Sequence, residues 1–207
     1  MLNALKQIKR SVPYTARIMM LSRKRIVVGE RSKIEPGVIW WKYDEATIQI
    51  GSDSIIETAC RIRADECGSV TVGNRVTLRQ GVTLKSSGTL NIDDDVYVNT
   101  YCHIACAGTI NIASKVMIGP GVVIVDSDHD YSDPGVAMRD APLLPGNIAI
   151  GYGVWIAANV TITRNVTIGD HALIAAGAVV TRDIPAGAIC GGVPAAIIRY
   201  REGFHPV

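Results

Sequence analysis

Residues 150–180 read "IGYGVWIAANVTITRNVTIGDHALIAAGAVV", and isoleucine or valine returns at every sixth position from Ile150 to Val180. A six-residue period fits neither the 3.6-residue turn of an α-helix nor the two-residue alternation of a plain strand. It describes a triangular prism in which each hexad is a short strand ending in a tight corner. Three hexads then make one coil, and stacked coils lie ~4.8 Å apart with their anchor residues in an inner ladder.

The same six-residue spacing also occurs in most of the chain before residue 150. The earlier anchors are Val28, Ile34 and Trp40; Ile50, Ile56 and Ile62; Val72, Leu78 and Leu84; Ile92, Val98 and Ile104; Ile112, Ile118 and Ile124. Extra residues between trios always follow the third hexad, so every insertion leaves from the same edge of the prism. The pattern predicts an all-β parallel β-helix of about seven coils over residues 28–188. A cap of residues 1–27 precedes it and a short tail of residues 189–207 follows it.

The longest insertion is the loop 126–149, which begins "DSDHDYSDPG" and places one histidine, His129, among aspartates. Loops of this length in so regular a frame are usually functional. We therefore expect this loop to have a function. The competing interpretation is an exposed loop histidine whose aspartate neighbours serve only to form turns.

Composition agrees with a β protein, because aromatic residues make up only 5% of a chain that is 48% hydrophobic. The five cysteines contain no CxxC pair, which favours a reduced, cytoplasmic protein with buried thiols. The apolar patch at 18–21 is too short to span a bilayer, and its flanks do not resemble a cleavable signal.

The N-terminal segment is strongly basic. Residues 1–33 contain nine Lys or Arg and one acid. A solvated helical cap on the end of the β structure is the favoured interpretation, divided at Pro13. A basic amphipathic element that contacts the inner face of a membrane is the alternative. Nucleic-acid binding is not favoured, because no aromatic platform accompanies the basic residues.

The chain resembles the hexapeptide-repeat acyltransferases, whose fold is a left-handed parallel β-helix. Residues 168–199, "IGDHALIAAGAVVTRDIPAGAICGGVPAAIIR", look like the closing signature of that family. Within it, the sequence most resembles the maltose/galactoside acetyltransferase group and its surface-polysaccharide O-acetyltransferase relatives. The left hand is implied by the resemblance alone, since parallel crossovers are normally right-handed.

The resemblance also implies roles for three residues. "IGPGVVIVDSDHD" places the catalytic base of the group on His129, "VYVNTY" places its acceptor-binding asparagine on Asn99, and "GYGVWIAANV" places its cofactor-side tryptophan on Trp155. Many members continue His-Pro, whereas this chain has Asp130 after the histidine. We therefore expect different acceptor contacts.

Histidine suits the implied chemistry. Acetylating a sugar hydroxyl needs a base that takes the hydroxyl proton during attack on a thioester and then returns a proton to the leaving thiolate. An aspartate on the other ring nitrogen would fix the tautomer, and Asp126, Asp128 and Asp130 are unranked candidates for that role.

A groove for the cofactor is expected along the edge that holds Asn99, because Trp155 and a set of small residues return to that edge in later coils. The small residues are Ala157, Ala158, Ala175, Ala176 and Gly177. A pantetheine arm could lie against them, and Arg182 and Arg199 could meet the phosphates of coenzyme A.

His129 leaves from a different edge, about one strand or ~16 Å from the edge of Asn99. The two residues therefore cannot share an acceptor within one subunit. The trimers of the family, with active sites between subunits, agree with this expectation.

Together these observations predict a homotrimeric, acetyl-CoA-dependent O-acetyltransferase that acts on a saccharide or nucleotide-linked sugar in surface polysaccharide biosynthesis, without a metal. Sugar N-acetylation and O-acetylation of serine or an antibiotic are the alternatives on the same fold. A non-enzymatic scaffold is the alternative of a different class. A zinc-dependent carbonic anhydrase is disfavoured, because His103, His129, His171 and His205 lack its spacing.

Overall fold

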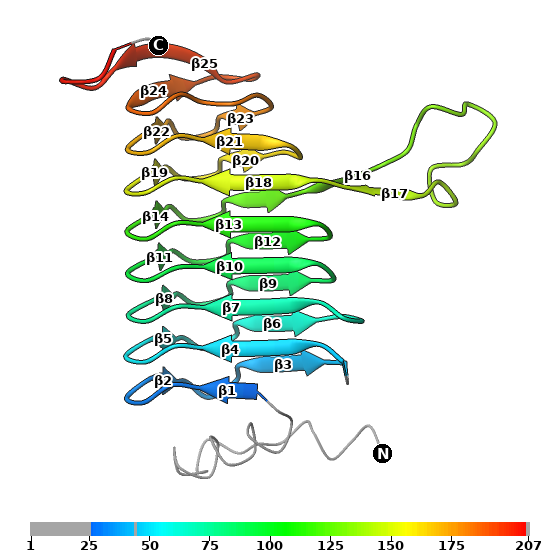
Figure 1. Ribbon diagram of the computed structural model, residues 1–207, viewed down its shortest axis with the longest axis vertical. Coiled ribbons are helices and arrows are strands. Elements are labelled where there is room, and N and C mark those ends of the chain that lie inside the picture. Colours follow the sequence, from blue (N-terminus) through cyan, green and yellow to red (C-terminus); the bar gives the residue numbers. More distant parts are fainter. Residues whose placement is uncertain (1–25, 44, 206–207) are drawn as a thin grey trace.

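The solenoid architecture is confirmed. The computed structural model describes residues 26–43 and 45–205, which form 25 strands and no helix. The chain passes repeatedly through three sheets, here called A, B and C, and a hairpin projects from one corner (Figure 1). Corners are named by the sheets they join: A–B, B–C and C–A.

Sheet A contains β1 (Ile26–Val28), β4 (Thr47–Ile50), β7 (Ser69–Val72), β10 (Thr89–Ile92), β13 (Thr109–Ile112), β18 (Asn147–Ile150) and β21 (Val166–Ile168). Sheet B contains β2 (Lys33–Ile34), β5 (Ile55–Ile56), β8 (Thr77–Leu78), β11 (Tyr97–Val98), β14 (Met117–Ile118), β19 (Trp155–Ile156), β22 (Leu173–Ile174), β24 (Ala188–Gly191) and β25 (Ala196–Tyr200). Sheet C contains β3 (Ile39–Lys42), β6 (Arg61–Ala64), β9 (Thr83–Ser86), β12 (His103–Cys106), β15 (Val123–Val125), β20 (Thr161–Ile162) and β23 (Val179–Val180).

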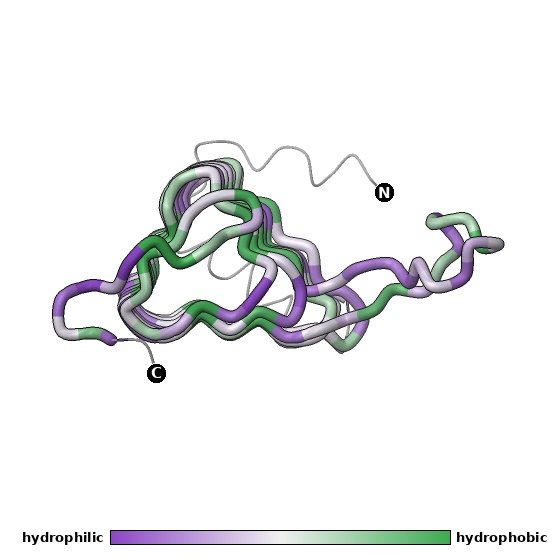
Figure 2. The backbone as a smooth tube through the Cα atoms, turned by 90° about the horizontal axis from the view of Figure 1, so that it is seen from above, coloured by the Kyte–Doolittle hydropathy of each residue, from purple (hydrophilic) through white to green (hydrophobic). Residues whose placement is uncertain are grey.

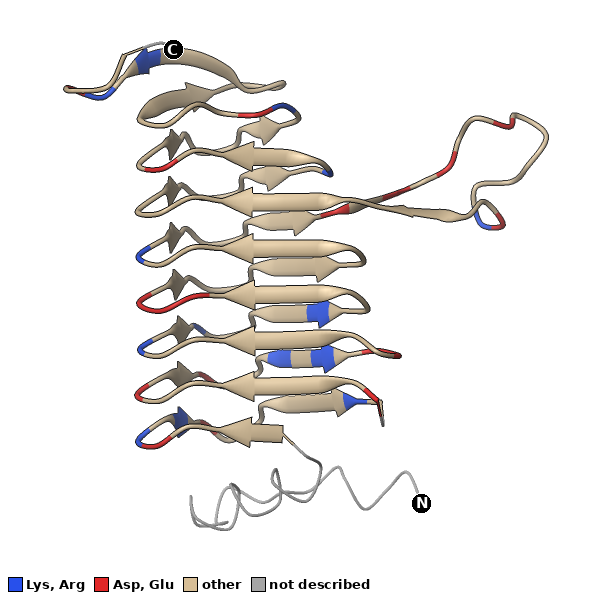
Figure 3. Cartoon of the chain, in the orientation of Figure 1, with Lys and Arg blue, Asp and Glu red and all other residues tan. Residues whose placement is uncertain are grey.

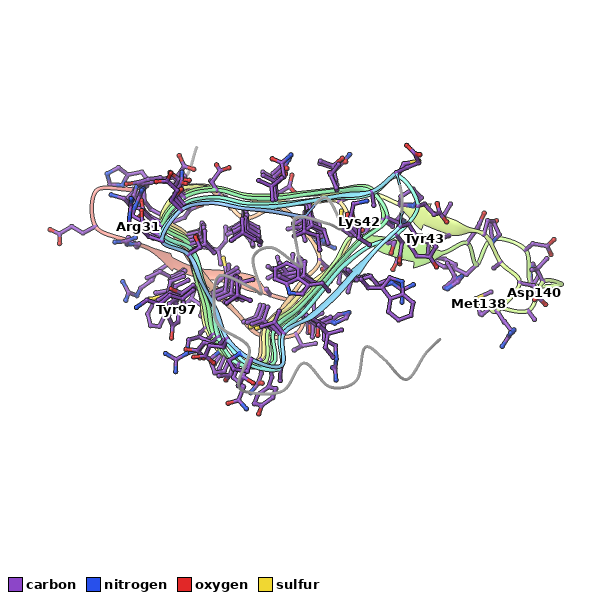
Figure 4. The ribbon with its side chains drawn as sticks, turned by 90° about the horizontal axis from the view of Figure 1, so that it is seen from below. Arg31, Lys42, Tyr43, Tyr97, Met138 and Asp140 are labelled. Atoms are coloured by element: carbon purple, nitrogen blue, oxygen red, sulfur yellow. The ribbon has the colours of Figure 1, made fainter. Side chains whose placement is uncertain are left out.

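The six-residue anchors are the residues that fill the core. In sheet B, Val98 lies between Leu78 and Ile118 in parallel register, and all three are fully buried. Seen down the axis, the coils superimpose into one triangular outline (Figure 2), and stacked side chains fill its interior (Figure 4). Because each coil repeats the same backbone path, an inward position in one coil is inward in the next.

Both ends of the solenoid differ from the expectation. Ile26 and Val27 belong to β1, so the first coil begins inside the expected cap of residues 1–27; residues 1–25, where a helix was expected, lie outside the described residues. Seven coils have all three strands, but Ile184 bridges to Ile168 and β24 pairs with β22, which adds a partial eighth turn. The expected boundary at residue 188 therefore falls within the solenoid. Beyond it, β25 turns back antiparallel on β24.

A column of alternating charge marks the A–B corner. The corner residues of the first five coils are Arg31, Asp53, Arg75, Asp95 and Lys115, each with φ between 55° and 61°. Arg31 Nε lies 2.6 Å from Asp53 Oδ1, and Arg75 Nε lies 2.6 Å from Asp95 Oδ1. Hydrogen bonding by Arg75 lowers the pKa of the Asp95 carboxyl. These pairs are exposed, so each stabilises the fold little.

Four of the five cysteines point into the core, and burial raises the pKa of the Cys60 thiol to about 11. Cys67 is exposed, contrary to the expectation of buried thiols.

Replacing one rung of the inner ladder is expected to destabilise the protein strongly. Ile48→Ala removes a fully buried side chain from β4 and should lower the free energy of unfolding by about 2–5 kcal/mol. Thr47→Ala, at the neighbouring outward position, should change it by less than about 0.5 kcal/mol. Denaturant unfolding measures both, and equal losses would contradict the assignment of the core.

Candidate functional site

The expected loop is a β-hairpin. β16 (Ser127–His129) pairs antiparallel with β17 (Leu143–Pro145), and β18 resumes the solenoid at Asn147. The hairpin leaves the C–A corner after β15, the same corner at which Lys42 and Tyr43 of the first coil lie (Figure 4). Its far end, with Met138 and Asp140, stands well away from the prism. The structure therefore projects a paired ribbon over residues 127–145, shorter than the expected loop 126–149.

Asp126 fixes the root of this hairpin. Its side chain is fully buried, and its two carboxylate oxygens accept hydrogen bonds from the backbone N–H groups of Ala107 at 2.7 Å and Gly108 at 2.9 Å. These donors belong to the C–A corner of the preceding coil. The carboxylate near the Cys106 thiol adds to burial in raising the pKa of that thiol to about 12. Asp126 thus ties the departing ribbon to the coil on its N-terminal side.

The other two aspartates also have structural partners. Asp128 accepts a hydrogen bond of 3.0 Å from Arg164 Nε, at the C–A corner of the next coil. Asp130 accepts one from the backbone N–H of Ser132 at 2.9 Å, and hydrogen bonding by the side chain and the backbone of Ser132 lowers the pKa of its carboxyl. None of these three carboxylates is hydrogen-bonded to the His129 ring in the structure, and the orienting role expected of Asp126, Asp128 or Asp130 stays a prediction.

The group that orients His129 is a backbone carbonyl. Nδ1 of the ring lies 3.0 Å from the carbonyl oxygen of Ala141, on the returning side of the hairpin. A carbonyl can only accept, so the hydrogen of the neutral ring is on Nδ1 and the lone pair is on Nε2. The residue is exposed, which leaves Nε2 open to an acceptor hydroxyl. This is the arrangement that a general base requires.

A column of small residues follows the B–C corner. Asn99 comes directly after β11, and the next three coils place Gly119, Ala157 and Ala175 at the same position. Their register is fixed by hydrogen bonds from Asn99 N to Ile118 O (2.9 Å), Gly119 N to Ile156 O (2.7 Å) and Ala157 N to Ile174 O (2.9 Å). A Cβ on Gly119 would lie 2.7 Å from the backbone of Ala157, so only glycine fits there.

Gly119 was absent from the sequence-based prediction. It follows anchor Ile118 as Ala157 follows Ile156, so the hexad register alone could have located it.

Asn99 keeps a free donor. Its Oδ1 accepts a hydrogen bond from the Thr100 N–H at 2.8 Å, while Nδ2 has no protein partner among the described residues. The amide can therefore donate to a ligand in front of this corner.

The remaining predicted cofactor residues divide between corners. Trp155 stands on the outer face of β19 with 45% of its surface exposed, just before Ala157. Ala158, Ala176 and Gly177 lie in the B–C corner beside the column. Arg182 does not belong with them, because it follows β23 at the C–A corner, and Arg199 lies on the capping strand β25. The structure does not bring these two arginines onto the column.

Asn99 and His129 occupy different corners of the solenoid. Asn99 precedes a sheet C strand, β12, whereas His129 follows another, β15. The width of sheet C therefore separates them within one chain, as expected.

No cluster of three or more His, Cys, Asp or Glu side chains arranged to hold a metal ion occurs in the described part of the chain. The same residues include no helix long and apolar enough to cross a membrane.

Known proteins share both the repeat and the fold. A family model described as bacterial transferase hexapeptide (six repeats) matches residues 147–182. The chain is 34% identical over 154 residues to the "Putative lipopolysaccharide biosynthesis O-acetyl transferase WbbJ" of Escherichia coli, covering 70% of this chain and 78% of that protein. It is 26% identical over 130 residues to the "Putative colanic acid biosynthesis acetyltransferase WcaF" of the same species, covering 63% and 69%.

A crystal structure of the hexapeptide-repeat acetyltransferase VCA0836 of Vibrio cholerae, complexed with acetyl coenzyme A, matches with a TM-score of 0.51 at 22% identity. The matched region covers 92% of this chain and 80% of the Vibrio cholerae chain. The chain belongs to the hexapeptide-repeat acetyltransferase family, and it is an acetyltransferase.

Removing the buried carboxylate should loosen the hairpin. Asp126→Ala leaves two partly buried N–H groups without their carboxylate acceptor, at a cost of about 1 kcal/mol each. Trypsin should then cleave after Arg139 faster than in the wild type, at a digestion temperature where both proteins remain folded. Asp133→Ala is the matched control, since that carboxylate accepts a hydrogen bond from the Gly135 N–H near the far end of the hairpin, away from its root. Equal cleavage of all three proteins would contradict the anchoring role.

Proposed function

We propose that the protein transfers the acetyl group of acetyl-CoA to a hydroxyl of a saccharide or nucleotide-linked sugar in surface polysaccharide biosynthesis. The observation that carries this proposal is the orientation of His129, which presents Nε2 in a chain related to two polysaccharide acetyltransferases. We further propose that the solenoid is left-handed, as the family resemblance implies. We also propose that the enzyme acts in the cytoplasm; contact of the basic N-terminal segment with the inner face of the membrane is the alternative to a solvated cap.

The acetyl donor fits the B–C corner. Gly119, Ala157 and Ala175 leave the backbone uncovered along three successive coils, so an extended pantetheine arm can lie in contact with it. Trp155 borders the column and offers an apolar wall. The position of Asn99 at the start of the column suits an amide that donates to the acceptor.

The reaction needs no enzyme nucleophile. His129 Nε2 takes the hydroxyl proton as the acceptor oxygen forms a bond to the thioester carbon. As the carbon–sulfur bond breaks, the protonated ring returns that proton to the thiolate sulfur. The Ala141 carbonyl holds Nδ1–H throughout, and its dipole favours the imidazolium that forms between the two steps.

A site between subunits follows from the separation of the two corners. His129 stands on a projecting ribbon and Asn99 lies on a flat corner, so the hairpin of one subunit can reach the column of its neighbour. We propose a homotrimer, in which cyclic symmetry makes three equal sites.

The first test removes the base. With radiolabelled acetyl-CoA and a panel of sugars, His129→Ala should lower the transfer rate by roughly 100-fold to 10,000-fold. His205→Ala, which changes an exposed histidine near the C-terminus, should retain wild-type activity. Alkaline release of the acetyl label would identify an ester rather than an amide. Full activity of His129→Ala would remove His129 from the mechanism.

The second test concerns the shared site. Asn99→Ala and His129→Ala proteins should each be inactive alone, but when unfolded and refolded together they should recover about a quarter of the wild-type activity. This fraction arises because a random neighbour pair keeps both residues once in four. Absence of any recovery, with mixed trimers verified by mass spectrometry, would place each site within one chain.

A further inference from the structure

Cationic side chains gather on the outer face of sheet C, on the coils that precede the hairpin. β6 carries Arg61 and Arg63, and β9 carries Lys85, so blue segments mark both strands in Figure 3. Arg63 pairs in register with Lys85, and Lys85 with Ala105 of β12. By contrast, the seven strands of sheet A carry no charged residue at all.

Two of these cations lack a counter-charge. Arg63 is engaged, because it bonds Asp65 and stacks over the ring of Trp41 with 4.9 Å to the centroid. Arg61 and Lys85 have no ion-pair partner within residues 26–43 and 45–205, and both are exposed. Burial lowers the pKa of the nearby His103, and the positive charge of Lys85 lowers it further.

Lys85 faces a hollow beneath the hairpin. The hollow is lined by Lys85 and Ser87 below, by residues 105–107 behind, and by Ser127 and Leu143 of the hairpin above. Ser127 and His129 are two residues apart on one strand and so share a face of the ribbon, and His129 pairs with Leu143. The catalytic histidine thus lies on the ribbon face that roofs the hollow. Lys85 is two strand spacings from Val125 at the hairpin root, ~10 Å away.

The hollow lies on the acceptor side of the site. The small-residue column that suits the pantetheine arm starts at Gly119, in the coil from which the hairpin leaves, and continues through the next two coils at Ala157 and Ala175. Lys85 belongs to the coil before that of Asn99, on the opposite side along the axis. Asp126 is buried behind the hollow with both oxygens bonded, and Asp128 is on the other face of the ribbon. Neither carboxylate neutralises Lys85 by an ion pair.

We propose that this hollow receives a negatively charged group of the acceptor, a phosphate or a sugar carboxylate, beside the hydroxyl that is acetylated. The proposal rests on the proposed function and narrows its substrate class from saccharides in general to anionic ones. Lys85 contacts the anion, Arg61 adds long-range attraction, and the Ser87 hydroxyl supplies a neutral donor.

The experiment is calorimetric titration of the full chain with pyrophosphate and with glucuronate, with glucose as the neutral reference. Saturating coenzyme A is present so that the phosphate contacts of the donor are already occupied. One of the anions should bind with about one site per chain, and Lys85→Glu should weaken that binding by at least about tenfold. Lys33→Glu makes the same charge change on sheet B and should alter it less than about twofold.

Each anion and each variant in this experiment tests a separate part of the proposal. Binding of pyrophosphate identifies a phosphate-linked sugar, and binding of glucuronate alone identifies an acidic sugar. Lys85→Met, with an unchanged melting temperature, should show an intermediate loss and separates charge from misfolding. The proposal is overturned if neither anion binds more tightly than glucose, if Lys85→Glu binds as the wild type does, or if a parallel titration without coenzyme A shows that the anion binds only in its absence. Binding of coenzyme A in the same samples tests the proposed function independently, and its failure would reject that function instead.

Discussion

The parallel hydrogen-bond ladder between coils is the constraint on which the rest of this structure depends. Each strand inside sheets A, B and C is bonded to the strands on both sides of it, so its length or phase cannot change without breaking bonds in both neighbours. Only the corners are free to vary. The insertions, most of the glycines and the hairpin occur there, because a corner can gain residues while the flanking strands keep their register.

The same constraint explains how reactive groups are arranged. Asn99 and the small residues lie at the same corner of successive coils. Backbone hydrogen bonds of 2.7–2.9 Å between these coils fix their positions. His129 must instead reach beyond the prism, and a lone loop would hold it poorly. The ribbon solves this by pairing its two strands and by fastening its root to the coil before and the coil after, through Asp126 and Arg164. Rigid support for a projecting base is what preorganised catalysis requires.

The sequence alone predicted the features that follow from the six-residue period. The three sheets, the core anchors, the corner from which the hairpin leaves and the column after Asn99 all follow from counting. The partial eighth turn was missed because Ile184 stands only four residues after Val180, although Cys190 then follows Ile184 by six.

The hydrogen-bond partner of the His129 ring could not be predicted from the sequence either. It is a backbone carbonyl brought near by the pairing of Leu143 with His129, and any residue type at 141 supplies a carbonyl. Three nearby aspartates suggested a side chain, yet all three hold backbone or arginine groups. Local composition signals which groups are available, whereas the register of a ribbon decides which of them meet.

The alternating corner column bears on how the chain finds its own order. Consecutive coils are so alike that a coil could stack on the wrong neighbour with its hydrophobic ladder intact. If the first coil skipped the second and stacked on the third, Arg31 would face Arg75; the same error further along would oppose Asp53 to Asp95, or Arg75 to Lys115. Exposed pairs contribute little to the stability of the correct stack. Their alternation nevertheless penalises a skipped coil anywhere among the first five, because it would place like charges opposite one another.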